Sequence, residues 1–308
     1  MLRKRWYLFP IIGVFVITLV LGSFFDLQIN TAIYDRYNGF GLFMAAFGET
    51  PVYLSFGILG FGFLFLFKKF ENVWIKVLLV VGIVGTLGCC IYFQGKHIFD
   101  VNGYNNKSLY WLGYLIAFFI YCIGFGLGYL LFKNTNVEAK KILFILLTLI
   151  VIEGLTQGVN QLTKIFMSRP RFRLLAELAQ TNEYRNWWEN GKAFRDSILG
   201  NNTTWPGTDV LITKEEFKSF PSGHMTNTFV MLPVLVALPM LNPNFKVKQE
   251  ILIAISFVWC GLLAYSRMLV GAHFLSDVSV GSLVTLVLYF VINEIYIKLD
   301  RRFFPQAE

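Results

Sequence analysis

Eight apolar stretches dominate this sequence, and each is close to the length that crosses a bilayer. A transmembrane helix needs roughly 20 apolar residues, and only helices and closed barrels can span lipid. The stretches lie near residues 8–25, 51–67, 73–93, 109–132, 142–163, 222–241, 250–267 and 273–297. We therefore predict an all-α fold, a polytopic membrane helix bundle with about eight transmembrane helices.

The composition agrees with a membrane protein. Charged residues make up 15% of the chain, whereas soluble domains carry about 25%. The net charge of +8 would suit nucleic acid, but the cations can be placed at span ends and in the motifs described below. We therefore predict no nucleic-acid partner.

Basic clusters fall in the loops at one end of the eight-span arrangement. They are Arg3 to Arg5, Lys68 and Lys69, Lys133 with Lys140 and Lys141, Lys246 with Lys248, and Lys298 with Arg301 and Arg302. Basic residues beside spans mark the cytoplasmic side. We expect a plasma-membrane protein with both termini in the cytoplasm. The N-terminal run lacks a small-x-small cleavage site, which favours an uncleaved signal anchor over a signal peptide.

Two segments depart from the span pattern. Residues 31–48 are apolar but interrupted by glycines, which indicates an interfacial or re-entrant helix. Residues 172–220 are polar and rich in aromatic side chains, and 172–198 has helical periodicity that would suit a helix lying on the membrane. This second segment is either a solvated connector or a lid over a substrate site.

The four cysteines offer no metal site or disulfide framework. Cys89, Cys90, Cys122 and Cys260 all lie inside apolar runs, and none has the spacing of a metal ligand. We expect them to be small buried hydrophobic residues.

The last apolar stretch begins with the pattern Ser266-Arg267-x5-His273-x3-Asp277. His273 and Asp277 are four apart and would share a helix face. The carboxylate of Asp277 could then accept the ring N–H of His273, which frees the other nitrogen to attack phosphorus. The alternative is a plain polar contact at a helix start, but ionisable groups in a membrane are costly unless they serve a function.

The sixth apolar stretch opens with Pro221-Ser222-Gly223-His224. Proline suits a helix start, and Ser222 and Gly223 would offer a hydroxyl and backbone N–H groups to an anion at the helix N-terminus. His224 could protonate a leaving oxygen as a general acid. Taken alone, the pattern also fits an ordinary N-cap with a hydrogen-bonded histidine.

A third pattern, Lys164-x6-Arg171, ends the fifth stretch. Lys164, Arg171 and Arg267 could neutralise the non-bridging oxygens of a phosphoryl group. Arg169 and Arg173 are close in sequence and could simply anchor the helix at the membrane edge. In the eight-span order, all three patterns fall at the same, non-cytoplasmic end.

Polar residues also share a helix face with Lys164 inside the fifth stretch, namely Glu153, Gln157, Asn160 and Gln161. A polar stripe in lipid should face the bundle interior. It would either form hydrogen bonds between helices or contact a substrate.

Together, the three patterns resemble the tripartite signature of the type 2 phosphatidic acid phosphatase (lipid phosphate phosphatase) superfamily, over residues 142–297. That family's first motif normally ends in Arg-Pro. Here Phe172 follows Arg171, and Arg169-Pro170 comes two residues early. The spacing from Lys164 favours Arg171 as the phosphate ligand, and Arg169 stays as the alternative.

The resemblance implies a six-helix phosphatase core, here with an extra N-terminal hairpin, and a metal-independent reaction with no cofactor. It implies that His273 is the nucleophile that forms a phosphohistidine, that Asp277 supports it, and that His224 serves as acid and then assists water. The implied phosphate ligands are Lys164, Arg171, Ser222, Gly223 and Arg267.

The expected substrate is a membrane lipid phosphate or diphosphate, such as phosphatidate, phosphatidylglycerol phosphate or a polyprenyl diphosphate, met at the outer membrane–water interface. A phosphotransferase with the same phosphohistidine is one alternative. A membrane transporter is another, although the two halves show no internal repeat. Residues 1–141 would be N-terminal transmembrane helices, 142–297 the catalytic core with 172–220 as an extracytoplasmic loop or cap, and 298–308 a cytoplasmic tail.

Overall fold

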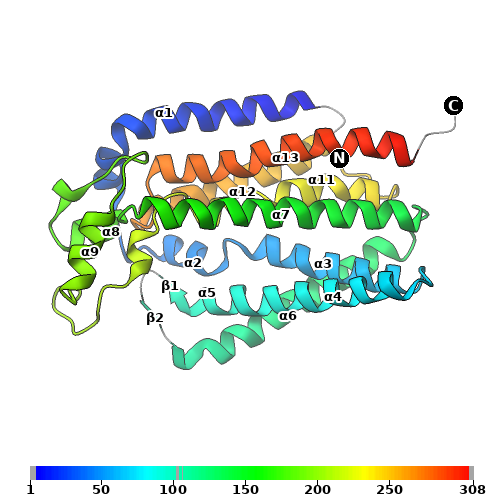
Figure 1. The fold of residues 1–308 in the computed structure, drawn as a ribbon, viewed down its shortest axis with the longest axis horizontal. Helices are drawn as coiled ribbons and strands as arrows, with labels where there is room; N and C mark the ends of the chain where they lie inside the picture. The colour runs from blue at the N-terminus through cyan, green and yellow to red at the C-terminus, as the bar shows by residue number, and fades with distance from the viewer. Residues whose placement is uncertain (1–4, 102–103, 106, 305–308) are drawn as a thin grey trace.

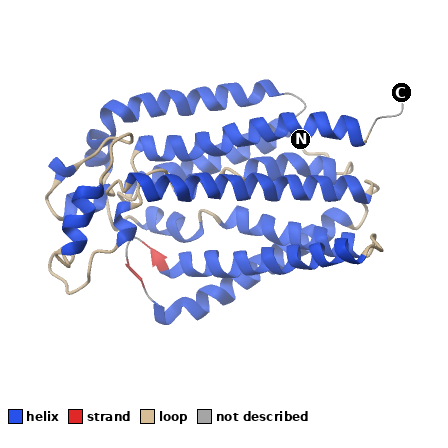
Figure 2. Cartoon of the chain, in the orientation of Figure 1, coloured by secondary structure: helices blue, strands red, loops and turns tan. Residues whose placement is uncertain are grey.

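The computed structural model describes residues 5–101, 104–105 and 107–304. Within these ranges, eight helical segments are long and apolar enough to cross a membrane, and almost all regular structure is helical (Figure 2). The predicted all-α bundle of eight spans is confirmed. The eight segments are Leu8–Ile33, Gly39–Phe67, Val73–Phe99, Lys107–Phe132, Ala139–Glu177, Gly223–Leu241, Gln249–Leu269 and Leu275–Phe303.

The individual elements follow the spans closely. The first half contains α1 (Leu8–Ile33), α2 (Gly39–Phe47), α3 (Thr50–Phe67), α4 (Val73–Cys89), a π-helical turn (Cys90–Gln94), α5 (Gly95–Phe99) and α6 (Tyr110–Phe132). Two short antiparallel strands, β1 (Asp100–Val101) and β2 (Tyr104–Asn105), join α5 to α6. The second half contains α7 (Ala139–Met167), α8 (Phe172–Glu177), α9 (Lys192–Gly200), α10 (Gly223–Thr228), α11 (Met231–Leu241), α12 (Gln249–Leu269) and α13 (Leu275–Phe303).

The bundle has two distinct ends (Figure 1). Helices α8 and α9 cover one end, whereas the first turn of α1 and the last turn of α13 lie at the other. Helix α1 packs mainly along α13, and α3 packs mainly against α4 and α6. The predicted extra N-terminal hairpin is therefore divided between two parts of the bundle.

Glycines bring α3 and α6 into close contact. A Cβ atom at Gly124 would lie 3.1 Å from the Cα of Gly57, and one at Gly128 would lie 2.7 Å from the Cβ of Phe61. Small residues at such positions let two helix backbones approach in lipid, where dispersion contacts drive helix association. The same contact fixes α3, whose first turn lies beside the site described below.

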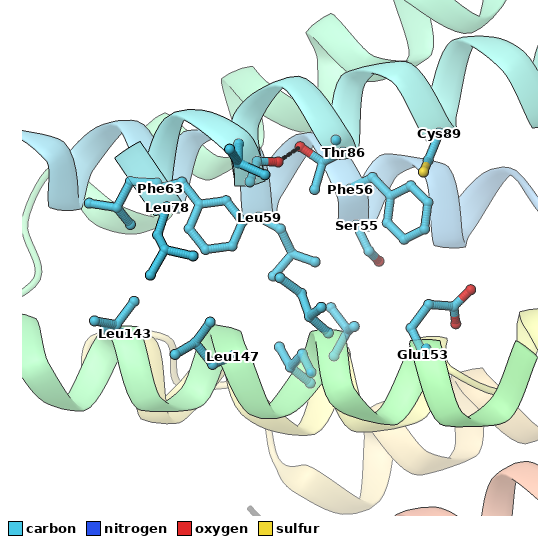
Figure 3. A pocket seen from close by; sticks show the side chains of 18 of the residues that line it. Ser55, Phe56, Leu59, Phe63, Leu78, Thr86, Cys89, Leu143, Leu147 and Glu153 are labelled. Atoms are coloured by element: carbon cyan, nitrogen blue, oxygen red, sulfur yellow. Dashed lines mark hydrogen bonds between the residues drawn. The ribbon is translucent and has the colours of Figure 1, made fainter. Parts of the chain in front are cut away.

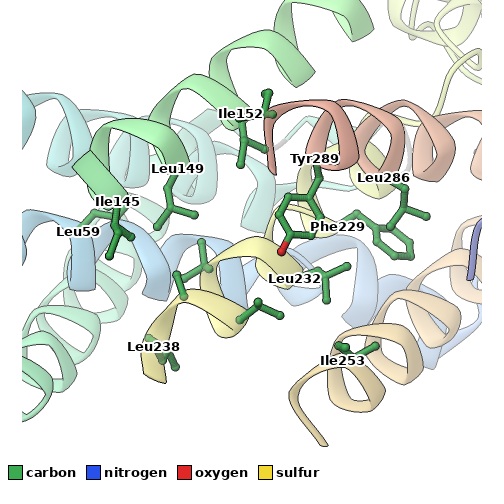
Figure 4. Packing of buried hydrophobic residues seen from close by; sticks show 14 of the residues in the cluster. Leu59, Ile145, Leu149, Ile152, Phe229, Leu232, Leu238, Ile253, Leu286 and Tyr289 are labelled. Atoms are coloured by element: carbon green, nitrogen blue, oxygen red, sulfur yellow. The ribbon is translucent and has the colours of Figure 1, made fainter. Parts of the chain in front are cut away.

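Helix α11 occupies the centre of the core, and α7, α12 and α13 surround it (Figure 4). Helices α1 and α4 instead expose most of their side chains, as expected where lipid covers an apolar helix. Cys90 and Cys260 are buried, whereas Cys89, which lines a cavity between helices, and Cys122 are exposed. The prediction that all four cysteines are buried was therefore wrong for two of them.

The two irregular segments differ from the expectation. Helix α2 is not a separate interfacial helix, because it forms the first part of the second span, which is broken at Gly48 and Glu49. The indole nitrogen of Trp259 donates to the Gly48 carbonyl at 2.8 Å and so satisfies an acceptor near the break. Residues 172–198 form two short helices separated by a loop, and not one long helix lying on the membrane.

Candidate functional site

The three sequence patterns meet at the end of the bundle beneath α8 and α9. The rings of His224 in α10 and His273, just before α13, have centroids 6.3 Å apart. The amino nitrogen of Lys164 on α7 lies 2.8 Å from the point that a Cβ on Gly223 would occupy. Arg267, in the last turn of α12, accepts hydrogen bonds from the backbone of Ala272 and His273 through its carbonyl oxygen. The predicted residues therefore come together from four helices.

His273 is buried, and its ring is held by a backbone carbonyl. Its Nδ1 atom lies 2.6 Å from the carbonyl oxygen of Ser219. A carbonyl oxygen can only accept, so Nδ1 carries the proton and Nε2 carries the lone pair. The carboxylate of Asp277 is 3.9 Å from Nδ1, within ion-pair range but too far for a hydrogen bond. The expected direct bond from His273 to Asp277 is thus replaced by one to Ser219.

Asp277 instead organises the turn that carries His273. Its Oδ2 atom accepts from the backbone N–H of Phe274 at 2.8 Å, which caps the start of α13, and from the hydroxyl of Ser219 at 2.5 Å. Its Oδ1 atom accepts from Arg169 at 2.5 Å. The carboxylate therefore fixes both the His273 turn and the residue whose carbonyl orients the ring.

Arg169 and Arg171 stand in different environments. Arg169 is completely buried and is bonded to Asp277, to Asp26 at 2.9 Å and to the hydroxyl of Ser276 at 2.8 Å. Arg171 is only partly buried, and its charge acts on His273. A guanidinium whose donors are already bonded within the protein is poorly placed to bind phosphate, which counts against Arg169 as the ligand.

Positive charge surrounds the His273 ring. Burial, followed by the charges of Arg171 and Lys164, holds the pKa of His273 well below its usual range. His224 and Arg267 act in the same direction. A ring kept neutral retains its nucleophilic lone pair, and a cluster of cations favours a bound anion with several negative oxygens.

A family model described as the PAP2 superfamily matches residues 143–301, more than half of the chain. The chain belongs to the PAP2 superfamily. PAP2 proteins are phosphatases, which supports a hydrolase acting on phosphate esters. The eight apolar helices indicate an integral membrane protein. No curated protein and no solved structure matches the chain.

Helix α1, outside the PAP2 match, supports the His273 turn. The carboxylate of Asp26 accepts from Arg169, from the backbone N–H of Ser276 at 2.9 Å and from the Ser276 hydroxyl. The amide of Asn30 donates to the carbonyl of His273 at 3.1 Å. Sequence reasoning missed both residues, although an acidic side chain at the edge of a membrane span is a usable signal.

The third histidine of the chain also lies at the PAP2 site. The ring of His97 in α5 is nearly parallel to that of His224, with centroids 5.7 Å apart and an interplanar angle of 17°. Its Nδ1 atom lies 3.1 Å from the carboxylate of Glu49, which is 4% exposed. Neither residue belongs to the motifs found in the sequence.

The cap, residues 172–220, is folded and packs on the PAP2 site. Arg173 forms a buried two-point ion pair with Glu216, at 2.8 and 2.6 Å. Burial opposes ionisation of Glu216, but Arg173 outweighs it, so the pKa of Glu216 lies below its usual value. The backbone N–H of Arg173 also donates to Gly271 at 3.0 Å, in the turn before His273. Apolar side chains of the cap form a second core with Phe274, namely Phe172, Leu174, Leu175, Phe194, Ile198, Trp205, Ile212 and Phe217.

The polar stripe on α7 leads from Lys164 toward an apolar cavity. Asn160 is buried, and Gln157 donates to Glu153 at 3.1 Å and to Asn227 at 3.2 Å. These three stripe residues face the protein as expected, whereas Gln161 is exposed. Glu153 lines one end of a cavity of about 490 Å³ between α3, α4, α7 and α11 (Figure 3).

No metal ligand set is found in the part of the chain that the structure describes. Within it, no three His, Cys, Asp or Glu side chains are grouped so as to hold a metal ion. The residues around His273 are mainly cationic, and such groups repel a metal ion and attract an anion.

Proposed function

We propose that this PAP2 protein removes a phosphate from a membrane lipid through a phosphohistidine on His273. The observation that carries the proposal is the orientation of that ring, whose Nδ1 atom is engaged by the Ser219 carbonyl. The other nitrogen keeps its lone pair, and the charges of Lys164, Arg171 and Arg267 act on the ring. This combination supports an attacking nucleophile beside a bound phosphoryl group.

The reaction would proceed in two displacements. In the first, Nε2 of His273 attacks phosphorus, the bond from phosphorus to the lipid oxygen breaks, and His224 gives its proton to that oxygen. In the second, His224 takes a proton from water, the water oxygen attacks phosphorus, and the phosphorus–nitrogen bond breaks. Inorganic phosphate then leaves. Lys164, Arg171 and Arg267 would neutralise the non-bridging oxygens in both steps, with Ser222 and Gly223 at the same surface.

The hydrocarbon tail of the substrate would occupy the cavity beside Glu153. Its walls are almost entirely apolar, and its volume of about 490 Å³ falls in the usual range of small-molecule sites. Glu153 precedes Lys164 by eleven residues on α7, which is roughly 16 Å along a helix. A substrate that fills both regions must therefore have a long chain, as phosphatidate, phosphatidylglycerol phosphate and polyprenyl diphosphates do.

The arrangement of charge supports a site on the outer face of the plasma membrane. Within the described residues, the basic clusters belong to the end of the bundle opposite the cap, namely Lys68 and Lys69, Lys133 with Lys140 and Lys141, Lys246 with Lys248, and Lys298 with Arg301 and Arg302. Cations beside spans mark the cytoplasmic side. His273 would then meet its lipid at the outer interface, and residues 298–308 would be cytoplasmic.

The decisive test is His273→Ala in the full-length protein, assayed in detergent for phosphate release from phosphatidate and from a polyprenyl diphosphate. Removal of a nucleophile should lower kcat on the order of 10³-fold or more. An unchanged thermal unfolding midpoint would show that the fold persists. Full activity in this variant would reject the mechanism. Release of inorganic phosphate, with none transferred to an alcohol acceptor, would separate hydrolysis from phosphotransfer.

Chelation gives a second test of the same proposal. In the proposed steps, Lys and Arg side chains bind the phosphate and no divalent cation takes part. EDTA should therefore leave kcat for phosphatidate within about twofold of that of the untreated enzyme. Activity that disappears with EDTA and returns with a divalent cation would contradict the metal-independent reaction.

A further inference from the structure

Glu49 and His97 form a carboxylate–imidazole pair beside His224. The Glu49 carboxylate contacts Nδ1 of His97 and also accepts from the hydroxyl of Tyr53, both at 3.1 Å. Three imidazole rings therefore follow one another as His97, His224 and His273, with centroid separations of 5.7 and 6.3 Å.

Two irregular helix segments bring this pair into place. Glu49 lies at the break between α2 and α3, and His97 follows the π-helical turn of residues 90–94. The two segments hold each other, because the amide of Gln94 donates to the carbonyl of Ala46 at 3.0 Å. Trp259 of α12 donates to Gly48 next to the break. Such departures from regular helix are rare inside a bilayer and occur where a function requires them.

The charges around His224 explain why a carboxylate is needed there. A general acid must hold a proton before the reaction, yet burial opposes a charge on His224. The positive charges of Arg267, His97 and Lys164 act in the same direction. Glu49 acts on the same ring with negative charge, and opposite charge favours the protonated imidazole.

We propose that Glu49 and His97 are positioning residues that orient His224 toward the leaving oxygen and offset the positive charge around it. This inference rests on the proposed function. In the first displacement, the His224 proton passes to the lipid oxygen as the phosphorus–oxygen bond breaks. In the second, the proton of water restores it. Glu49 stays a carboxylate throughout. The ring of His97 holds that carboxylate and stacks on the ring of His224.

The charged and titratable groups that face His224 come from every element packed around it. They are Glu49 at the α2–α3 break, His97 of α5, Lys164 of α7, Arg267 of α12 and His273 before α13. Only Glu49 in this set is negative. Its removal should therefore affect proton donation by His224 and leave the attack by His273 in place.

The test compares two leaving groups in the full-length enzyme. The alkoxide of phosphatidate needs a proton as it leaves, whereas p-nitrophenolate does not. Glu49→Gln should lower kcat for phosphatidate about 10- to 100-fold, which is less than complete loss of a general acid would cost. The same variant should change kcat for p-nitrophenyl phosphate less than about threefold. His97→Phe, which keeps a flat ring, should show the same selectivity. Glu71→Gln, at an exposed turn, is the matched control.

The outcomes separate the two proposals. Equal losses on both substrates, or none, would overturn the role of Glu49 and His97 while leaving the phosphatase reaction intact. A wild-type enzyme inactive on both substrates would reject the proposed function, and the inference with it. The pH profile gives an independent readout, since the alkaline limb of kcat for phosphatidate, where the general acid loses its proton, should move to lower pH in Glu49→Gln. If Glu49→Gln fails to fold, His97→Phe decides the question alone.

Discussion

Helices α7, α10, α12 and α13 bring the proposed reacting side chains of this protein, whereas α1, α3 and α5 bring side chains that contact them or the turns that carry them. The first group lies within the PAP2 match and supplies Lys164, His224 and His273. The second lies outside it and supplies Asp26 behind the His273 turn, and Glu49 and His97 beside His224. One site is therefore built from two halves of the chain.

The difference teaches that reacting groups and supporting groups are constrained differently. A reacting group must meet a phosphoryl group in a fixed order and geometry, which ties it to a local motif. A supporting group needs only to reach its partner with the right charge, so any neighbouring helix can provide it. The contrast between Arg169 and Arg171 shows this within one loop, since Arg169 is bonded to Asp26 from the other half.

The largest effect should come from breaking the buried ion pair between the halves. Asp26→Ala leaves Arg169 with one carboxylate in place of two, and removal of one partner from a buried pair costs about 3–5 kcal/mol. We expect a clearly lower midpoint of thermal unfolding in detergent. Asp209→Ala, at an exposed position of the cap, should leave the midpoint unchanged. Equal midpoints for the two variants would show that α1 does not brace the site.

The second-largest effect should be on the catalytic rate more than on the stability of the protein. Arg171→Ala removes a proposed phosphate ligand, and loss of one group that stabilises transition-state charge costs about 10²- to 10³-fold in kcat. The unfolding midpoint should fall less than in Asp26→Ala, because the backbone N–H of Arg171 that donates to the Glu216 carbonyl is kept in alanine. Arg301→Ala, at the far end of α13, is the matched control. A large stability loss in Arg171→Ala would erase the distinction between the two arginines.

The sequence carried enough information for the bundle and for the motifs. Apolar runs of membrane length predict the eight spans, because the bilayer allows almost no other structure. Lys164, His224 and His273 are identifiable because their neighbours in sequence define the pattern. The direct bond from His273 to Asp277 was wrong, since helix spacing assumed that His273 lies within the helix, and α13 starts two residues later, at Leu275.

The supporting groups could not be assigned in the same way. The partners Asp26 and Arg169 are separated by 143 residues, and Glu49 and His97 by 48. Their contacts depend on how α1 and α3 pack, which in lipid is decided by close backbone approach at positions such as Gly57 and Gly124. The break at Glu49 is flanked by Gly48 and Pro51, which the sequence shows, but the π-helical turn before His97 has no distinctive local pattern.

The smallest expected effect concerns which lipid the protein binds, as distinct from the rate at which it removes the phosphate. Gly85 of α4 lines the cavity, and a Cβ there would meet nothing within 4 Å. Gly85→Leu should therefore fill the cavity without a clash, and leucine is about 1 kcal/mol better than glycine in a helix interior. We expect KM for long-chain phosphatidate to rise about tenfold, because a few lost apolar contacts are worth about 1–3 kcal/mol. Kinetics with a short-chain phosphate should stay unchanged.

Gly126→Leu provides the matched control for this experiment. Gly126 is an exposed glycine of α6, and a Cβ there also meets nothing within 4 Å, but it does not line the cavity. Kinetic constants of Gly126→Leu should match the wild type for both chain lengths. If Gly85→Leu changes both substrates equally, the tail lies elsewhere. A selective change would mean that the N-terminal half determines which lipid is bound, while the PAP2 half determines what happens to its phosphate.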